Sequence, residues 1–277
     1  MPNAESGIVG PLPDVVLSGD IDLGFVQPWY QPKLDLIHGG MAGVESLARY
    51  EPPHGPFSRN GGFVEKIRQS GRLHSMVKKL LRLNARDMLW WRKQGLEMPV
   101  SVNAEWVMVE TGWLLDQLNE VSKQFDIPLS SFRVEVTEHE SVESIARATR
   151  ALSDLQSRGV KIVLDDFGVD NSSLSVLSAF HFDCIKIDRR FIQGIHADMR
   201  NAAIVAGIVN IAGNLGMKVV AEGVENICDL HALGRIGCHY VQGFLYGKPM
   251  KAADVLGFYR EESDIRRSAE SADYQVE

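Results

Sequence analysis

Short apolar runs that end in a carboxylate or amide side chain recur along most of this chain. They occur as Gly-Val-Glu45, Val-Ser-Val-Asn103, Val-Glu135-Val-Thr-Glu138, Val-Leu-Asp165-Asp166, Lys186-Ile-Asp188 and Val-Val-Ala-Glu222-Gly-Val-Glu225. If these runs are parallel strands of one barrel, their polar ends meet at a single rim. Carboxylates at such short range repel one another unless a cation binds between them. The pattern therefore predicts a metal site lined by oxygen atoms.

Helical segments separate most of these runs. We expect strands at 23–36, 41–49, 99–103, 132–136, 161–165, 183–188, 217–222 and 240–243, and amphipathic helices at 76–94, 112–125, 142–158, 201–215 and 228–236. A strand that follows a helix needs a crossover connection and joins a parallel sheet. Only a short segment that contains His38-Gly39-Gly40 separates the first two strands, so these should form an antiparallel hairpin. The order predicts an α/β fold, a (β/α)8 TIM-like barrel with an antiparallel first strand.

A doubly wound open sheet is the alternative, but it would need a glycine-rich phosphate loop, and the chain has neither Gly-x-Gly-x-x-Gly nor a Gly-Lys-Ser/Thr motif. We expect residues 1–20 to be a leader or linker, residues 21–262 to form the barrel, and residues 263–277 to be a polar tail that frays. With 277 residues, 45% of them hydrophobic, the chain can bury one substantial core.

The net charge and the cysteine and histidine residues indicate which partners, location and metal ions to expect. A net charge of −7 argues against DNA or an anionic membrane as partner, and no apolar run approaches the length of a membrane span. The three cysteines lack Cys-x-x-Cys spacing, so we expect buried free thiols and a cytoplasmic location. The histidines show no ligand spacing, and an oxygen-lined site favours Mg²⁺ or Mn²⁺ over zinc.

The adjacent Asp165 and Asp166 are the sharpest indication of metal binding. Both can face the rim only if a shared cation offsets their repulsion, and one such carboxylate can bridge two metal ions. A lone acid at a strand end is more often a turn residue or a helix cap. These two aspartates lie too early to cap the helix expected near Ser172, which Asn171 or Ser172 can cap.

Lys186 lies in a strand with inward alternation, where a lysine needs carboxylate partners. It would orient a water molecule or stabilise charge on a phosphate. A purely structural counter-charge is an equally good interpretation.

The motifs and their order resemble the EAL domain, the cyclic di-GMP phosphodiesterase module of bacteria. The resemblance extends from about Phe25 to Met250. It rests on Tyr30-Gln31-Pro32, Glu45-Ser46-Leu47-Ala48-Arg49, Asn103, Glu135-Val-Thr-Glu138, Asp165-Asp166-Phe167-Gly168, Lys186-Ile-Asp188, Glu222-Gly-Val-Glu225 and Gln242-Gly243-Phe244. It implies the same barrel with an antiparallel first strand.

The resemblance also implies roles for individual residues. Two divalent cations, Mg²⁺ or Mn²⁺, would be held in each active site, one by Glu45, Asn103, Glu135 and Asp165, the other by Asp165, Asp166 and Glu222. The catalytic residues would be Lys186, Glu222 and Glu45, and the substrate would contact Gln31, Leu47, Arg49, Asp188 and Gln242. Glu225 and Gln242 would support the metal ligands, and Glu138 would tether a loop.

The implied reaction is hydrolysis of cyclic di-GMP to linear pGpG by two-metal activation of water, in a homodimer with a possible regulatory protein partner. A cyclic di-GMP receptor with little or no turnover is the alternative. A protein-interaction module ranks last, because every metal ligand is present.

The sequence departs from the family pattern in three places. Val169-Asp170-Asn171 replaces a Thr-Gly-Tyr segment, Phe63-Val-Glu65-Lys-Ile67-Arg68 replaces Phe-Ile-Pro-x-Ala-Glu, and Glu105 stands where a serine is usual. Asp170 replaces a glycine whose backbone is expected to have positive φ, at a cost of roughly 1 kcal/mol. We therefore expect weaker coupling between the dimer and the metal site.

Overall fold

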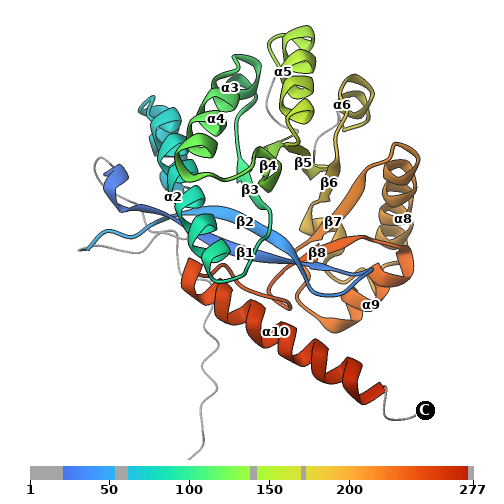
Figure 1. The fold of residues 1–277 in the computed structure, drawn as a ribbon. Helices are drawn as coiled ribbons and strands as arrows, with labels where there is room; N and C mark the ends of the chain where they lie inside the picture. The colour runs from blue at the N-terminus through green and yellow to red at the C-terminus, as the bar shows by residue number, and fades with distance from the viewer. Residues whose placement is uncertain (1–20, 54–61, 138–141, 170–172, 274–277) are drawn as a thin grey trace, which may run out of the picture.

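Eight strands close into one barrel in chain order, so that the last strand returns to the first (Figure 1). The computed structural model describes residues 21–53, 62–137, 142–169 and 173–273. The strands are β1 (Val26–Asp35), β2 (Met41–Tyr50), β3 (Val100–Asn103), β4 (Phe132–Thr137), β5 (Lys161–Phe167), β6 (Cys184–Ile187), β7 (Lys218–Glu222) and β8 (Tyr240–Gln242). Every expected strand is present, and closure of the barrel excludes the open sheet.

β1 is the strand that departs from the parallel order. It pairs antiparallel with both β2 and β8, whereas the other neighbouring strands pair parallel. In the turn between β1 and β2, Gly39 and Gly40 have φ of 71° and 83°. Glycine adopts positive φ at little cost, so the turn can be this short. The antiparallel first strand is confirmed.

Helices surround the barrel, and the C-terminal helix α10 lies along the outside next to β1 (Figure 1). They are α1 (Gly62–Gln69), α2 (Leu73–Lys93), α3 (Trp106–Glu110), α4 (Trp113–Phe125), α5 (Ile145–Ser157), α6 (Ser173–Ala179), α7 (Arg189–Ile192), α8 (Met199–Asn214), α9 (Ile227–Ile236) and α10 (Ala252–Asp273), with 3-10 turns η1 (Leu23–Phe25) and η2 (Leu129–Ser131). Trp91 Nε1 donates to the carbonyl oxygen of Ala252 at 2.9 Å and ties α2 to α10. Within the described ranges, no helix combines the length and the apolar character needed to cross a membrane.

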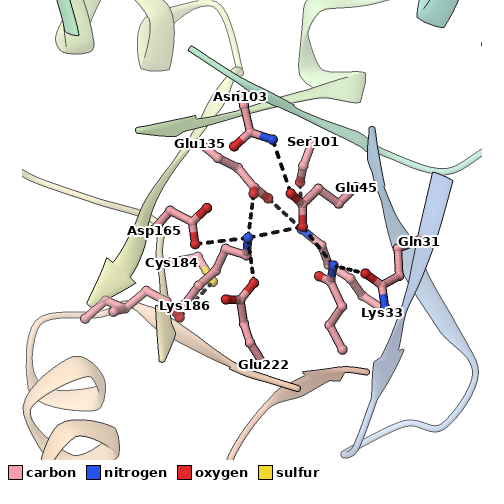
Figure 2. A network of polar contacts seen from close by, with 12 residues as sticks. Gln31, Lys33, Glu45, Ser101, Asn103, Glu135, Asp165, Cys184, Lys186 and Glu222 are labelled. Atoms are coloured by element: carbon pink, nitrogen blue, oxygen red, sulfur yellow. Dashed lines mark hydrogen bonds and ion pairs between the residues drawn. The ribbon is translucent and has the colours of Figure 1, made fainter. Parts of the chain in front are cut away.

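Alternation along each strand sorts side chains between the two sides of the barrel wall. On β4, Phe132, Val134 and Val136 belong to the large apolar core, whereas Glu135 lies inside the barrel (Figure 2). The barrel wall thus carries an apolar outer face for the helices and a polar inner face for the site.

Inside the barrel, a small apolar layer lies beneath the polar one. Val163, Cys184 and Val220, from β5, β6 and β7, form a separate buried cluster. Two residues further along these strands come Asp165, Lys186 and Glu222. Because a step of two residues keeps a side chain on the same face of a strand, these polar groups form the next layer toward the carboxyl ends of the strands.

Three local expectations are corrected by the structure. β1 does not begin at Leu23, because the Asp22 carboxylate accepts a hydrogen bond from Gly24 N at 2.7 Å and caps η1. The boundary expected at residue 262 falls within α10, which continues to Asp273. Cys184 and Cys238 are buried free thiols as expected, but Cys228 is exposed.

Candidate active site

Polar side chains from six successive strands, β2 to β7, meet inside the barrel (Figure 2). They are Glu45, Asn103, Glu135, Asp165, Lys186 and Glu222. The convergence expected from the sequence is therefore present. Glu45 lies in the middle of β2 rather than at its end, because the β1–β2 hairpin continues to the Val26–Tyr50 pair.

Lys186 lies at the centre of this group and is 1% exposed. Its Nζ is 2.7 Å from Glu222 Oε1, 2.8 Å from Glu135 Oε2, 3.0 Å from Asp165 Oδ1 and 3.1 Å from Glu45 Oε2. An ammonium group has three protons and cannot donate fully to four carboxylates. Burial alone would lower the pKa of Lys186, but the surrounding carboxylates raise it well above its ordinary value. Lys186 therefore stays charged.

The carboxylates around Lys186 are not equivalent. Burial would raise the pKa of Glu135, but Lys186 and Lys33 outweigh it and hold this pKa below the ordinary value. For Asp165, burial and the nearby charges of Glu222, Glu135 and Glu45 raise the pKa well above its ordinary value, although Lys186 opposes them. Burial also raises the pKa of Glu222. If all four carboxylates were ionised, they would outnumber Lys186 and Lys33, so a bound cation would favour the ionised forms of Asp165 and Glu222.

Asp165 and Asp166 are brought together by an irregularity in β5. The register between β5 and β6 shifts between Leu164 and Phe167, and Asp166 has φ of 56°. Such a bulge re-aims side chains that would otherwise point to opposite faces. Left-handed backbone at an aspartate costs of order 1 kcal/mol, and such strain is concentrated at functional sites.

The donor atoms fit two divalent cations. One group of carboxylate oxygens comes from Glu45, Glu135 and Asp165, and a second comes from Asp165, Asp166 and Glu222. Within each group the ligand atoms lie within 4.8 Å of one another, and Asp165 belongs to both. Asn103 adjoins the first group, since its Nδ2 donates to Glu45 Oε1 at 3.2 Å. Oxygen ligands of this kind suit Mg²⁺ or Mn²⁺.

A buried second lysine, Lys33, also belongs to the site, and the sequence analysis missed it. Its Nζ donates to Glu135 Oε1 at 2.7 Å and to Ser101 Oγ at 2.8 Å (Figure 2). Lys33 follows Gln31 by two residues on β1, so inward alternation from Gln31 was the signal that could have identified it.

Two glutamines position Glu45 from the side of β1 and β8. Gln242 Nε2 donates to Glu45 Oε2 at 2.8 Å and to Gln31 Oε1 at 3.1 Å. Gln31 Nε2 is itself held by the carbonyl oxygen of Gly247 at 3.1 Å. The buried Oε1 of Gln242 meets no hydrogen-bond donor among the residues that the structure describes.

A cavity of about 440 Å³, the α1–α2 pocket, adjoins the carboxylates on one side. Leu47, Arg49 and Asn103 line it, together with apolar residues of α2. The buried Asn84 also faces this pocket, and its Nδ2 has no partner in the described part of the chain. A mainly apolar cavity with a few directed polar atoms is typical of small-molecule sites.

A second cavity, the β7–β8 pocket, has a volume of about 300 Å³ and lies next to the carboxylates of Asp166 and Glu222. Asp166, Asp188, Glu222, Glu225 and Gln242 line it.

Two of the three departures from the family pattern are in direct contact. Arg68 donates from Nη1 to Glu65 Oε2 at 2.6 Å and from Nε to Glu105 Oε1 at 2.5 Å. Glu65 and Arg68 line the α1–α2 pocket. The third departure, at Asp170 and Asn171, and the proposed tether Glu138 lie outside the described residues.

Sequence comparison agrees with the architecture. The sequence model of the EAL domain matches residues 16–249. The bifunctional diguanylate cyclase/cyclic di-GMP phosphodiesterase MucR of Pseudomonas aeruginosa is 34% identical over 228 residues, which is 82% of this chain and 33% of MucR. The cyclic di-GMP phosphodiesterase RocR of the same species is 31% identical over 256 residues, 90% of this chain and 64% of RocR. The chain thus spans about a third of MucR and less than two thirds of RocR.

Solved structures show the same similarity. The MucR phosphodiesterase in complex with c-di-GMP superposes with a TM-score of 0.77 at 33% identity, covering 84% of this chain and 94% of that one. The EAL domain of Mycobacterium smegmatis DcpA gives 0.73 at 27% identity, covering 87% and 99%.

Proposed function

Because this chain belongs to the EAL domain family, we propose that it is a divalent-metal-dependent phosphodiesterase that hydrolyses cyclic di-GMP to linear pGpG. The observation that carries the proposal is the pair of carboxylate groups that share Asp165 and surround Lys186. The similarity to proteins named cyclic di-GMP phosphodiesterases supports the choice of substrate.

In this proposal, Glu45, Asn103, Glu135 and Asp165 hold one cation, and Asp165, Asp166 and Glu222 hold the other. When bound, the two cations would lower the pKa of a water molecule and offset the charge that develops on the phosphate. The grouping of the ligand atoms around Asp165, and the crowding of carboxylates that raises the pKa of this residue, support the assignment.

Lys186 would act as a charged hydrogen-bond donor rather than as a base. Its raised pKa keeps the proton on Nζ. With metal cations bound to the carboxylates, Nζ would be able to donate a hydrogen bond to the attacking water or to a phosphate oxygen. Because this interaction strengthens as charge develops, it would contribute mainly to the transition state.

The two pockets would each receive one half of the symmetric dinucleotide. Leu47 and Arg49 would contact the base side in the α1–α2 pocket, and Asp188 and Gln242 would contact the other half in the β7–β8 pocket. Gln31 would act through Gln242, to which it is hydrogen-bonded. Glu225 at the edge of the second pocket would support the metal ligands.

A receptor that binds cyclic di-GMP with little turnover is the second candidate. The similarity to complexes of EAL proteins with c-di-GMP is compatible with it, but the complete set of metal ligands favours catalysis. We further propose a cytoplasmic location and a homodimer. Size-exclusion chromatography with light scattering would test the dimer.

Incubation of the purified protein with cyclic di-GMP and Mg²⁺, followed by chromatography, tests the proposal. We expect pGpG to form, and to cease forming in excess chelator. Binding of cyclic di-GMP without pGpG would favour the receptor, and undiminished turnover in chelator would overturn the metal mechanism.

A further inference from the structure

The α1–α2 pocket has a buried end that the proposed function does not use. Glu45 points into the barrel (Figure 2), and because side chains alternate along a strand, Ser46 lies on the outer face of β2, toward α2. There Ser46 Oγ donates to Asn84 Oδ1 of α2 at 2.9 Å. Leu47 and Arg49, proposed to contact the substrate, are half-buried and lie toward the mouth of the pocket. The strand β2 therefore stands between this buried end and the carboxylates.

Most side chains around the buried end are apolar. Those of α2 recur at helical spacing and so share one face of the helix, and β3 adds one more: Met76, Val77, Leu80, Leu81 and Val102. Leu80 is half-buried, and the others are buried. With a volume of about 440 Å³, the whole pocket has the size of a small-molecule site.

Asn84 is the polar group of the buried end, and one half of its amide has no partner. The residue is 1% exposed. Its Oδ1 accepts from Ser46 Oγ at 2.9 Å and from the Tyr30 hydroxyl at 3.0 Å. Its Nδ2 meets no acceptor within the described ranges of the chain, although it faces the cavity. A buried donor without an acceptor is costly, so this one indicates a group that binds there.

Two other occupants fit the buried end poorly. An enclosed water molecule needs about two to four polar partners, and the side chains beside Nδ2 are mainly apolar. A guanine base carries several donors and acceptors, and most of them would lose their hydrogen bonds with water without replacement. An apolar molecule with a single acceptor atom would satisfy Nδ2 and place apolar surface against the apolar wall.

We propose that the buried end of the α1–α2 pocket is a second ligand site, outside the barrel, for a small apolar molecule whose carbonyl oxygen accepts a hydrogen bond from Asn84 Nδ2. The site goes beyond the proposed function, because it uses neither the carboxylates nor a cation. The ligand would enter through the mouth of the pocket, where Arg68 and Asn103 are exposed.

Acetophenone and α-methylstyrene provide a matched pair of probes. A methylene group replaces the carbonyl oxygen in the second compound, and the shape is nearly unchanged. Their dissociation constants would be measured by NMR titration of the purified, ¹⁵N-labelled protein without metal or substrate. We expect acetophenone to bind and to shift the side-chain amide signals of Asn84, which the spectrum of Asn84→Leu identifies. No binding of acetophenone would overturn the proposal.

Asn84→Leu tests the hydrogen bond itself, since leucine has a similar volume and no donor. The affinity for acetophenone relative to α-methylstyrene should fall roughly fivefold in this variant, because only acetophenone loses a hydrogen bond. The ratio cancels the different hydrophobicity of the two probes and any general change in the cavity. An unchanged ratio would overturn the proposal.

Leu80→Phe is the control for location. The larger side chain takes up space in the cavity, so both probes should lose affinity together while their ratio stays at the wild-type value. Undiminished binding of both probes would place them elsewhere and would contradict the proposed site. Circular dichroism checks that both variants fold.

A crystal structure of the unaltered protein soaked in acetophenone keeps the inference testable if Asn84→Leu does not fold. We expect the carbonyl oxygen within hydrogen-bond distance of Asn84 Nδ2 and the ring against α2. Acetophenone bound only at the mouth of the pocket, or with its carbonyl group turned away from Asn84, would overturn the inference.

Discussion

Arg68 donates from Nε to Oε1 of Glu105 at 2.5 Å, and this contact joins α1 to the segment that follows Asn103. The EAL pattern has a glutamate at the position of Arg68 and a serine at that of Glu105. Two changes that look independent in the sequence therefore form one ion pair beside the α1–α2 pocket. The reversed charge at Arg68 is compensated by the new carboxylate.

Arg68→Glu should raise KM for cyclic di-GMP with a smaller change in kcat. It places a third carboxylate beside Glu65 and Glu105, next to the pocket proposed for an anionic substrate. Partly exposed pairs contribute up to about 1 kcal/mol, so a change of roughly fivefold is expected. The double variant with Arg68→Glu and Glu105→Ser should have a KM close to that of the unaltered protein.

The exposed pair of Lys78 and Glu120, at 2.9 Å, provides a matched control. Lys78→Glu reverses a charge on α2 and should leave both constants unchanged. If Lys78→Glu raises KM as much as Arg68→Glu does, the effect is one of net charge and not of the pocket.

Lys186→Ala should lower kcat by orders of magnitude, with a smaller effect on KM, because its charge is most useful in the transition state. The variant also leaves four carboxylates without their common partner, so metal-free protein should lose thermal stability and regain much of it in Mg²⁺. Steady-state kinetics and thermal unfolding with and without Mg²⁺ measure both. An effect confined to KM would assign Lys186 to substrate binding.

Glu45→Ala should abolish turnover while the protein remains folded. The change removes one carboxylate from a crowded acidic group, so the free energy of unfolding in the absence of metal should be unchanged or higher. Activity assays at saturating Mg²⁺ and denaturant unfolding provide the two readouts. Substantial activity in this variant would show that Glu45 is not a required ligand.

Metal binding should release protons, and affinity for Mg²⁺ should rise with pH. The metal-free fold raises the pKa of Asp165, mainly through burial and the neighbouring carboxylates, and burial also raises that of Glu222. A cation binds the ionised forms, so protons must leave as it binds. Calorimetry in two buffers of different ionisation enthalpy counts these protons, and their absence would contradict the raised pKa values.

The raised pKa of Asp165 also determines how the free energy of unfolding of the metal-free protein changes with pH. Between its ordinary pKa and its raised pKa, Asp165 holds a proton in the folded state but not in the unfolded state. The contribution of Asp165 to the free energy of unfolding therefore decreases as pH rises through this window. Asp165→Asn should reduce this pH dependence in the metal-free protein, and thermal unfolding across the window would detect it.

The barrel could be predicted because its evidence is local. A five-residue connection with two glycines, residues 36–40, favours an antiparallel hairpin, and β3 to β8 each follow a helix. The carboxylates at the carboxyl ends of these strands then had to converge. Glu45, Glu135 and Asp165 were identified in this way, and the structure brings them together.

The contacts of Lys33 and the bulge at Asp166 could not be predicted because they depend on closure of the barrel and on strand register. Alternation from Gln31 points Lys33 inward, but its burial against Glu135 follows from the return of β8 to β1. The left-handed backbone of Asp166 follows from a register shift against β6, which no local pattern specifies.

The reversed direction of β1 determines where the chain enters the barrel. Val26, where β1 begins, pairs with Tyr50 at the carboxyl end of β2, so the polypeptide enters the barrel at the catalytic rim. Lys79 Nζ donates to the carbonyl oxygen of Gly24 at 2.8 Å and anchors this entry segment to α2, which lines the α1–α2 pocket. In an all-parallel barrel the entering chain would lie at the opposite end. Here, a single helix, α2, connects the segment before β1 to the pocket proposed for the substrate.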